Sequence, residues 1–293
     1  MLYVYERGYM NATNPFNINN SSVFLRSPIK ASRACLMGLL ASGFLLGVAA
    51  TPANADNLIS STDYFNYELP DNIQAQCVER DNCPEIDIKY LNTNHRWIND
   101  MTNERINALV VNSKPTESAP IKTKLNQAAV NAAIDDFASS QFMDIPEGSS
   151  WAYSLMVTPE YLGHVSDFEL FEIDSYVFTG GAHGMPYSEY LVFDLSTKKQ
   201  IKLDDMLQSG TKSKFEALAY DAYKTWVKTV DDDVSSYEKN WPFTLSDNIT
   251  LTDKGIDIRY QHYSIGPYAY GMPVLSIPYS KLDGIIKPRF IIK

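Results

Sequence analysis

Two segments of this chain each join a run of aromatic and β-branched residues to a glycine-rich corner. They read Tyr176-Val-Phe-Thr-Gly-Gly-Ala-His-Gly184 and Tyr263-Ser-Ile-Gly-Pro-Tyr-Ala-Tyr-Gly-Met-Pro-Val-Leu-Ser-Ile-Pro-Tyr279. Glycine admits positive φ and proline fixes the direction of the chain, so each segment predicts a strand that meets a tight, exposed turn. Because loops on a rigid scaffold commonly carry recognition, we predict that turns 179–184 and 266–272 lie together at one end of a sheet.

The spacing of apolar residues predicts further strands and helices. Alternation predicts a strand at 87–91, and helical spacing predicts helices at 94–110 (capped by Asn92 or Asn94), 122–142 and 212–230. Strands are expected at 151–158, 165–171, 175–179, 187–194, 199–203, 244–251, 255–263 and 274–278. The turn at 252–255 should hold Gly255 at positive φ. Strands and helices in separate blocks predict an α+β fold: a mainly antiparallel sheet packed with helices, in two subdomains.

The N-terminus has the features of an export signal. Three basic residues, Arg26, Lys30 and Arg33, precede an apolar stretch at 34–50, and Ala-Asn-Ala follows. This pattern predicts cleavage between Ala55 and Asp56, and hence a periplasmic or secreted protein. The alternative is an apolar segment that is retained as a membrane anchor, which would make the chain a membrane-anchored sensor.

The cysteines of the exported part predict one disulfide. Cys35 leaves with the signal segment, so Cys77 and Cys83 remain. An even pair in an exported chain indicates a disulfide, here closing a short charged loop and contributing about 2–3 kcal/mol. No further ligand residues cluster nearby, so we predict no metal at this pair.

Acidic charge restricts the classes of partner. Residues 1–55 carry four basic and one acidic residue, so their removal changes the net charge from −10 to −13. Such a surface disfavours nucleic acid and anionic lipid and suits a basic partner protein. Membrane contact is expected only if the apolar segment is retained.

Catalytic sequence motifs are missing from the chain. It has no HExxH pattern, no G-x-S-x-G elbow and no Walker or dinucleotide-binding loop, so we predict no enzyme, no cofactor and no metal. Asp231-Asp-Asp233 lacks the spacing of a calcium loop and is expected at a solvated helix end. An alternative is a peptidoglycan-acting enzyme or accessory protein, which would need paired carboxylates such as Asp204-Asp205 or Asp167 with Glu169.

The two glycine-rich turns contain the candidate binding residues. In the first turn these are Gly181, which permits close approach to a partner, and His183, which either contacts a partner or holds the turn by hydrogen bonds; we favour the second role for His183. In the second turn they are Tyr268 and Tyr270, since tyrosine offers broad contact area at low entropy cost. Tyr263, like Tyr260, is expected to pack within its strand.

Residues 151–286 resemble the C-terminal domain of the RsiV-like family. The strand at 154–160, the turn at 179–184, the segment 190–207 and the segments 263–271 and 277–279 carry this similarity. Residues 83–91 and the helix after them are similar to the small module that precedes this domain, and that also precedes PdaC-type deacetylase domains. Together with the Pro- and Gly-containing linker at 144–150, the resemblance predicts a signal segment at 1–55, a module at 56–148 and a domain at 149–293.

The resemblance also implies a function. The family is best known for lysozyme sensing, so the chain is expected to be a non-catalytic binding or sensing protein of the bacterial cell envelope. The expected partner is a basic protein such as c-type lysozyme, or a cell-wall glycan.

Overall fold

The computed structural model describes residues 58–113 and 125–292, which belong to one compact unit. The predicted signal segment, with Cys35 and the cleavage site between Ala55 and Asp56, lies outside the described residues. Among the described residues, no helix is long and apolar enough to span a membrane.

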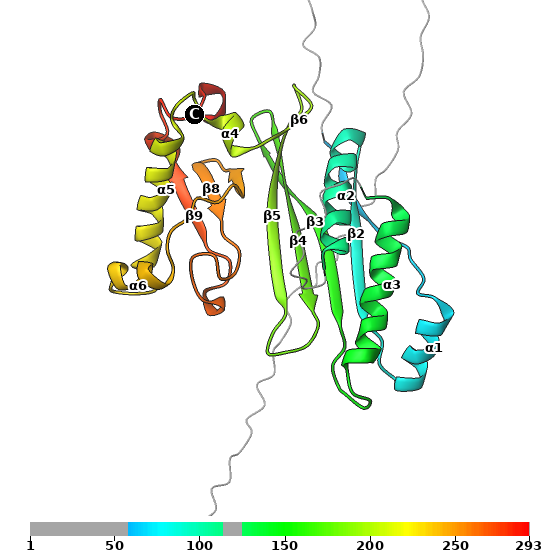
Figure 1. The fold of residues 1–293 in the computed structure, drawn as a ribbon. Helices are drawn as coiled ribbons and strands as arrows, with labels where there is room; N and C mark the ends of the chain where they lie inside the picture. Colours follow the sequence, from blue (N-terminus) through cyan, green and yellow to red (C-terminus); the bar gives the residue numbers. More distant parts are fainter. Residues whose placement is uncertain (1–57, 114–124, 293) are drawn as a thin grey trace, which may run out of the picture. The chain divides into compact units, whose positions relative to one another are not determined.

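Two β-sheets organise the fold (Figure 1). The larger sheet holds six strands in sequence order: β1 (Ser60–Tyr64), β2 (Glu85–Thr93), β3 (Ser154–Val165), β4 (Phe168–Phe178), β5 (Met185–Asp194) and β6 (Lys199–Ile201). The smaller sheet holds β7 (Ile249–Leu251), β8 (Gly255–Arg259) and β9 (Val274–Pro278). Within these sheets, β2 and β3 are parallel and every other pair is antiparallel. The predicted α+β class with a mainly antiparallel sheet is confirmed.

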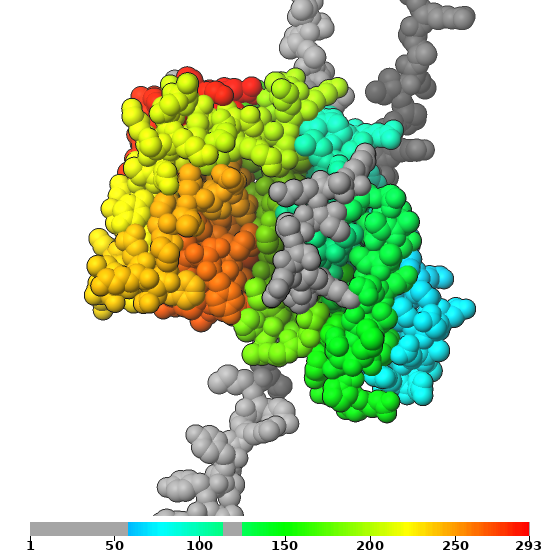
Figure 2. Space-filling model, in the orientation of Figure 1, coloured from blue at the N-terminus to red at the C-terminus, as the bar shows by residue number. Residues whose placement is uncertain are grey.

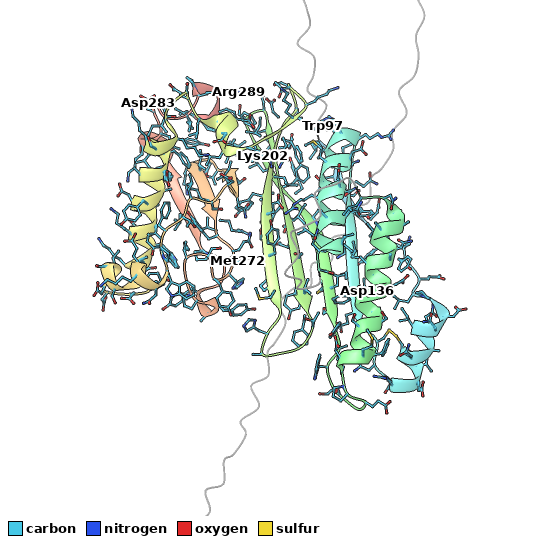
Figure 3. The ribbon with its side chains drawn as sticks, in the orientation of Figure 1. Trp97, Asp136, Lys202, Met272, Asp283 and Arg289 are labelled. Atoms are coloured by element: carbon cyan, nitrogen blue, oxygen red, sulfur yellow. A yellow bond between two sulfur atoms is a disulfide. The ribbon has the colours of Figure 1, made fainter. Side chains whose placement is uncertain are left out.

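Helices cover both sheets. They are α1 (Asp71–Arg80), α2 (Arg96–Val111), α3 (Gln127–Asp144), α4 (Leu203–Met206), α5 (Lys212–Val227) and α6 (Val234–Asn240), with 3-10 turns η1 (Tyr268–Tyr270), η2 (Tyr279–Lys281) and η3 (Pro288–Phe290). The helices α2 and α3 pack on the larger sheet, where Trp97 lies edge-on to Phe193 with ring centroids 5.4 Å apart (Figure 3). The helix α5 runs alongside β9 of the smaller sheet (Figure 1).

The strand β4 lies at the centre of the core because both of its faces are buried. Phe171 and Ile173 belong to the apolar cluster that includes α2 and α3. Phe168 and Leu170 belong to the cluster that includes α5 and the smaller sheet. Each such side chain contributes about 1.5–3 kcal/mol on burial, so β4 joins the two apolar clusters into one structure.

The strand β4 corrects one prediction. We expected two strands, at 165–171 and 175–179, because Glu172 and Asp174 interrupt the apolar run. The structure has a single strand in which Glu172 is 7% exposed. Its carboxylate pairs with Arg259 of β8, so this charged residue stays inside the strand.

The segment before β2 is more ordered than its composition predicts. The mostly polar residues 58–70 contain β1. This strand exposes four of its five residues and so lacks the apolar alternation of a half-buried strand. The helix α1 was not predicted at all. The helix α2 begins after His95 rather than after Asn92 or Asn94, and the Asn94 side chain instead accepts a hydrogen bond from Ile59 N at 2.9 Å.

A parallel strand pair crosses the predicted boundary at residue 148. The pairing runs from Glu85 opposite Ser154 to Ile88 opposite Val157. The predicted module at 56–148 and the predicted domain at 149–293 therefore contribute strands to one sheet.

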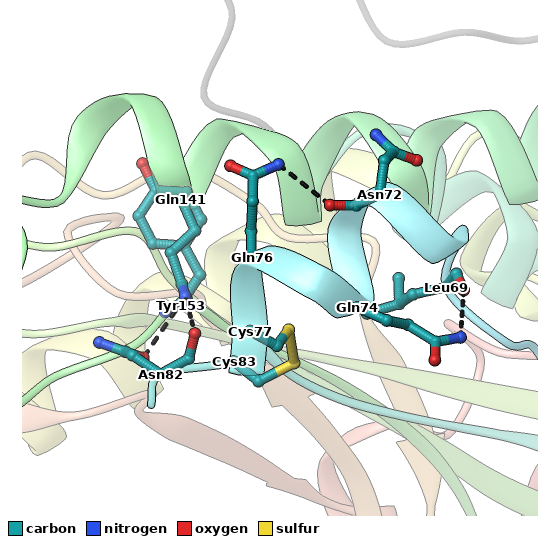
Figure 4. Close-up of a disulfide and its surroundings, with 9 residues drawn as sticks. All are labelled: Leu69, Asn72, Gln74, Gln76, Cys77, Asn82, Cys83, Gln141 and Tyr153. Atoms are coloured by element: carbon teal, nitrogen blue, oxygen red, sulfur yellow. Dashed lines mark hydrogen bonds between the residues drawn. A yellow bond between two sulfur atoms is a disulfide. The ribbon is translucent and has the colours of Figure 1, made fainter. Parts of the chain in front are cut away.

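The predicted disulfide joins the end of α1 to the start of β2. Cys77 and Cys83 are bonded, which confirms the predicted pairing (Figure 4). Between them, Asn82 donates from Nδ2 to the carbonyls of Ser149, at 3.2 Å, and Trp151, at 3.0 Å. The disulfide loop is thereby fastened to the segment that leads into β3.

Side-chain amides of the smaller sheet cover an edge of the larger one. The strand β6 pairs with β5 only over residues 192–194. Ser188 and Tyr190 pair with β4 on one side of β5, but no strand pairs with them on the β6 side among the described residues. Asn248 donates to Ser188 O at 2.7 Å and accepts from Tyr190 N at 2.7 Å. Gln261 donates to Ser188 O at 2.6 Å and accepts from Ser188 N at 3.2 Å. These bonds satisfy the edge of β5 and connect the two sheets.

Gly255 has a different role from the predicted one. It is not among the residues at positive φ; instead, a Cβ at this position would lie 2.1 Å from the backbone oxygen of Ile277. The turn before it is held by Thr252, whose Oγ1 accepts from Gly255 N at 3.0 Å. Glycine is needed here because β8 and β9 approach closely.

We predict that Gly255→Ala lowers the free energy of unfolding by about 1–3 kcal/mol, because the added methyl group forces the β8 and β9 backbones apart. Chemical denaturation measures the loss. Gly210→Asn is the matched control: Gly210 has φ +76° and no atom within 4 Å of a Cβ, and asparagine tolerates this backbone conformation. Equal stability of the Gly255→Ala variant and the wild type would contradict the close-approach explanation.

Candidate functional site

The turn between β4 and β5 is shaped by glycines, some held at positive φ and some held in close contact with an aromatic ring. Gly180 and Gly181 have φ of +102° and +87°. A Cβ on Gly180 would lie 2.9 Å from the Trp151 ring, and a Cβ on Gly184 would lie 2.3 Å from the Tyr176 ring. The aromatic residues before the turn therefore pack directly against its backbone and fix its shape.

The structure brings this turn together with the second turn. The His183 ring stacks on the Tyr268 ring with centroids 3.7 Å apart, and His262 stacks at 4.3 Å. The Tyr268 hydroxyl donates to Gly184 O at 3.0 Å. Tyr268 thus links the two predicted turns. The turn between β4 and β5 lies at the lower end of β5 in Figure 1. The sequence did not single out His262 as part of this stack.

Hydrogen bonds fix the orientation of the His183 ring. Its Nδ1 lies 2.9 Å from Gly184 O, and its Nε2 lies 3.2 Å from the Tyr263 hydroxyl. Because a carbonyl only accepts, Nδ1 carries the proton, and the Tyr263 hydroxyl can either donate to or accept from Nε2. The side chain is exposed, so the imidazole both holds the turn and faces solvent.

Tyr263 is not in a strand as predicted. The strand β8 ends at Arg259, and Tyr263 lies in the turn after it with φ +63° and 46% exposure. Positive φ is rare for an aromatic residue and is found mostly where a turn or a functional surface requires it. Tyr260 does pack as predicted and is only 2% exposed.

The other two candidates lie apart from the stack. Gly181 is exposed at the tip of the first turn. The Tyr270 ring is 42% exposed and lies edge-on to Trp226 of α5, with centroids 6.3 Å apart. Of the four candidates, the structure therefore brings only His183 and Tyr268 into contact.

A cavity of about 330 Å³ adjoins the first turn. Its wall combines hydroxyl, imidazole and apolar groups: Ser175, Val177, Thr179, His183, Met185 and Tyr187 are among the residues that line it. Behind the wall, Arg105 of α2 donates to the Tyr187 hydroxyl at 3.1 Å and pairs with Glu189. Burial raises the pKa of Tyr187, so its hydroxyl stays protonated at neutral pH. This mixture suits a polar ligand with apolar faces.

A buried polar cluster joins the two sheets behind the turns. Arg259 of β8 donates to Glu172 of β4 and to Ser188 of β5. It also donates to the Tyr190 hydroxyl at 2.6 Å and lies 4.4 Å from that ring's centroid. Burial raises the pKa of Tyr190 to about 12, so this hydroxyl remains protonated. The cluster unites residues up to 87 positions apart in sequence, so no local sequence signal identifies it.

The carboxylates that the enzyme alternative requires have structural partners. Asp204 pairs with Lys212 at 3.0 Å, and Asp205 accepts from Lys202 N at 2.9 Å at the start of α4. Glu169 accepts from the Tyr161 hydroxyl at 2.6 Å. Over residues 58–113 and 125–292, no group of three or more potential ligands is placed to hold a metal.

The acidic triplet at 231–233 lies at the start of a helix rather than at an unsupported helix end. Asp233 caps α6, accepting from Ser236 N at 3.0 Å. Asp231 accepts from Asp233 N at 2.8 Å. Acidic residues at a helix N-terminus are stabilising, which corrects the expectation of a solvated C-terminal end.

Comparison with known proteins finds one family model that matches part of the chain. The model of DUF3298, described as a protein of unknown function, matches residues 198–280. These residues form a DUF3298 domain. It extends from β6 through α5 and the smaller sheet to η2, so it contains the Tyr268 turn but not the His183 turn. The RsiV-like resemblance is narrower than this assignment and stays a prediction.

Two solved structures share the arrangement of the chain. One is a DUF3298 family protein from Pseudomonas aeruginosa PAO1, 27% identical with a TM-score of 0.56, covering 80% of this chain and 95% of that one. The other, from Bacteroides fragilis, is 16% identical with a TM-score of 0.57, covering 79% of this chain and 94% of that one, and it supports the fold alone. No curated protein matches the chain.

Proposed function

We propose that this chain is an exported, non-catalytic binding protein of the bacterial cell envelope that recognises its partner through the turns 179–184 and 266–272. The observation that carries the proposal is the stack of His183 on Tyr268, held at the surface beside a cavity of about 330 Å³. Interlocked glycines and hydrogen bonds order these aromatic groups before a partner arrives. Such preorganised aromatic groups lose little entropy on binding and suit an anchoring role.

The proposed partner is a basic protein, with c-type lysozyme as the specific candidate. Removal of residues 1–55 leaves a net charge of −13, which attracts a basic protein and speeds encounter. The resemblance of residues 151–286 to the RsiV-like family supports the same partner. A cell-wall glycan is the alternative ligand, because the cavity offers the hydroxyl groups and ring faces that bind sugars.

We predict that Tyr268→Ala weakens binding of lysozyme by residues 56–293 at least about tenfold, because it removes the ring between the two turns. His183→Ala should weaken binding too, and a fall in its melting temperature would measure how far it also holds the turn. Calorimetric titration gives both dissociation constants. Tyr64→Ala is the matched control, since Tyr64 is 67% exposed on β1 and takes no part in either turn.

Unchanged binding and unchanged melting temperature for both turn variants would remove the recognition role from this surface. The enzyme alternative is tested on the same wild-type sample, because peptidoglycan clearing in a gel assay would contradict a non-catalytic function. Binding of soluble muropeptides in place of lysozyme would redirect the proposal to the glycan alternative.

A further inference from the structure

A second surface, apart from the two turns, has the form of a peptide-binding groove. A groove of about 330 Å³ lies between α5 and β9. The helix contributes Leu218, Ala222 and Trp226, and the strand contributes residues 274–278. The DUF3298 match, to a family of unknown function, assigns no role to this groove.

One wall of the groove is an open sheet edge. The strand β9 is last in the order β7-β8-β9. Pro273 O accepts from Tyr260 N, and Tyr279 N donates to Lys254 O, so the alternate residues between them, Leu275 and Ile277, bond to β8. The N–H and C=O groups of Val274 and Ser276 therefore point outward, and in the described part of the chain no backbone group pairs with them.

The opposite wall offers an apolar stripe. Leu218, Ala222 and Trp226 follow one another at four-residue intervals on α5 and are half-buried. Residues at this spacing share one face of a helix, about 5–6 Å apart. Alternate side chains of an extended peptide are spaced by about 6.6 Å, so a strand laid along β9 can set its alternate side chains against this stripe.

The two ends of the groove carry opposite charge. At the Val274 end the groove reaches Thr229, and the chain continues directly into Asp231-Asp-Asp233, which is exposed. At the other end the groove reaches Lys281. Asp221, also in the wall of the groove, pairs with Lys224 at 2.8 Å. Because this ion pair is neutral, Lys281 gives its end of the groove a net positive charge.

We propose that the groove between α5 and β9 binds an extended peptide segment of another protein, which adds to β9 as a fourth, parallel strand. Its basic N-terminal end lies toward Asp231–Asp233 and its carboxyl end lies toward Lys281. The main-chain groups of Val274 and Ser276 supply the hydrogen bonds, and apolar side chains of the peptide rest on α5. Strand addition of this kind takes affinity from main-chain bonds and specificity from alternate side chains.

Pro278 limits the length of the added strand. Pro278 follows Ser276 at the next outward-facing position and has no N–H group to donate. Proline is common on natural edge strands, where it limits pairing with other chains. Main-chain pairing is therefore confined to Val274 and Ser276, in the part of β9 nearest the acidic end of the groove.

The test measures fluorescence anisotropy of a labelled peptide, Lys-Arg-Thr-Val-Thr-Val-Thr with a free carboxyl group, added to the full chain. Ser276→Pro removes one outward N–H group, and Ala222→Trp fills the groove without touching the strand. Each should raise the dissociation constant at least about tenfold. Ser276→Ala keeps the N–H group and should bind like the wild type, as should His183→Ala, which alters only the other surface.

Two altered peptides complete the test. Methylation of alternate backbone nitrogens should abolish binding, and reversal of the residue order should weaken it because the basic side chains then lie toward Lys281 and away from Asp231–Asp233. The proposal is overturned if the labelled peptide does not bind the wild type. It is equally overturned if the methylated peptide binds as tightly as the parent, or if folded Ser276→Pro and Ala222→Trp both retain wild-type affinity.

Discussion

Arg259→Met should lower the free energy of unfolding by about 3–5 kcal/mol, the usual cost of leaving a buried charge without its partner. In the wild type, Arg259 is 17% and Glu172 10% exposed in their side chains. The substitution leaves the Glu172 carboxylate buried without its guanidinium and removes the donor to Tyr190. Because these bonds join β4 and β5 to β8, the loss should also loosen the smaller sheet against the larger one.

Arg96→Met is the control for this prediction. The Arg96 side chain is 93% exposed and pairs with exposed Asp100, so its loss should change stability by less than about 1 kcal/mol. Combining Arg259→Met with Glu172→Gln should recover part of the loss, because the uncompensated charge is then gone. Both variants are measured by urea denaturation. If Arg259→Met and Arg96→Met have the same free energy of unfolding, the buried pair does not hold the sheets together.

Asp194→Asn is expected to cost about 2–3 kcal/mol at neutral pH. Asp194 ends β5 and is fully buried. Its Oδ1 accepts from Ser196 N at 2.9 Å, and its Oδ2 accepts from Thr197 Oγ1 at 2.8 Å and from Arg289, labelled in Figure 3, at 2.7 Å. In Asp194→Asn, the side-chain NH2 group replaces one carboxylate oxygen and cannot accept from these donors. The hairpin between β5 and β6 and the contact with Arg289 should therefore both weaken.

The pH dependence of this variant has a defined sign. Burial opposes ionisation of Asp194, but the hydrogen bonds from Ser196 and Thr197 and the Arg289 guanidinium outweigh it and hold the pKa below its ordinary value of 3.8. A depressed pKa stabilises the folded state above the ordinary value, and this contribution is lost as pH falls through the folded-state pKa. The free energy of unfolding of the wild type should therefore exceed that of Asp194→Asn by the largest amount at neutral pH. A difference that grows on acidification below pH 3.8 would contradict this account.

Much of the fold could be predicted because the elements after residue 151 carry local signals. The helix α5 and the hairpin of β5 and β6 follow from apolar periodicity and a polar turn. The strand β1 could not be predicted, since its side chains are mostly exposed and, among the described strands, it pairs with β2 alone. The strand β4 was divided in two because the sequence around Glu172 gives no sign of Arg259, which is 87 residues away.

The candidate site shows the same division between local and distant information. Glycine content correctly identified two turns, and the structure places His183 against Tyr268. The strand β8 ends at Arg259, four residues earlier than predicted. His262 and Tyr263 therefore lie in the turn after the strand, where His262 can join the stack and Tyr263 can adopt positive φ. Apolar alternation alone does not show where that strand stops pairing.

The contacts between the two sheets lead directly into the second turn. Gln261 bonds the backbone of Ser188 in β5, and His262 and Tyr263 follow directly in the second turn. Bonds between the sheets therefore hold the second turn against the first. A recognition surface built on two sheets in this way is rigid, and a partner should bind it with little rearrangement.

Calorimetric titration of residues 56–293 with c-type lysozyme, at low and at high salt, tests the proposed recognition role most directly. The account predicts a one-to-one complex with a dissociation constant in the micromolar range or tighter, weakened by salt because opposite charges steer the encounter. Tyr268→Ala in the same experiment should lose most of the heat of binding. No binding at either salt concentration would contradict lysozyme recognition by the two turns.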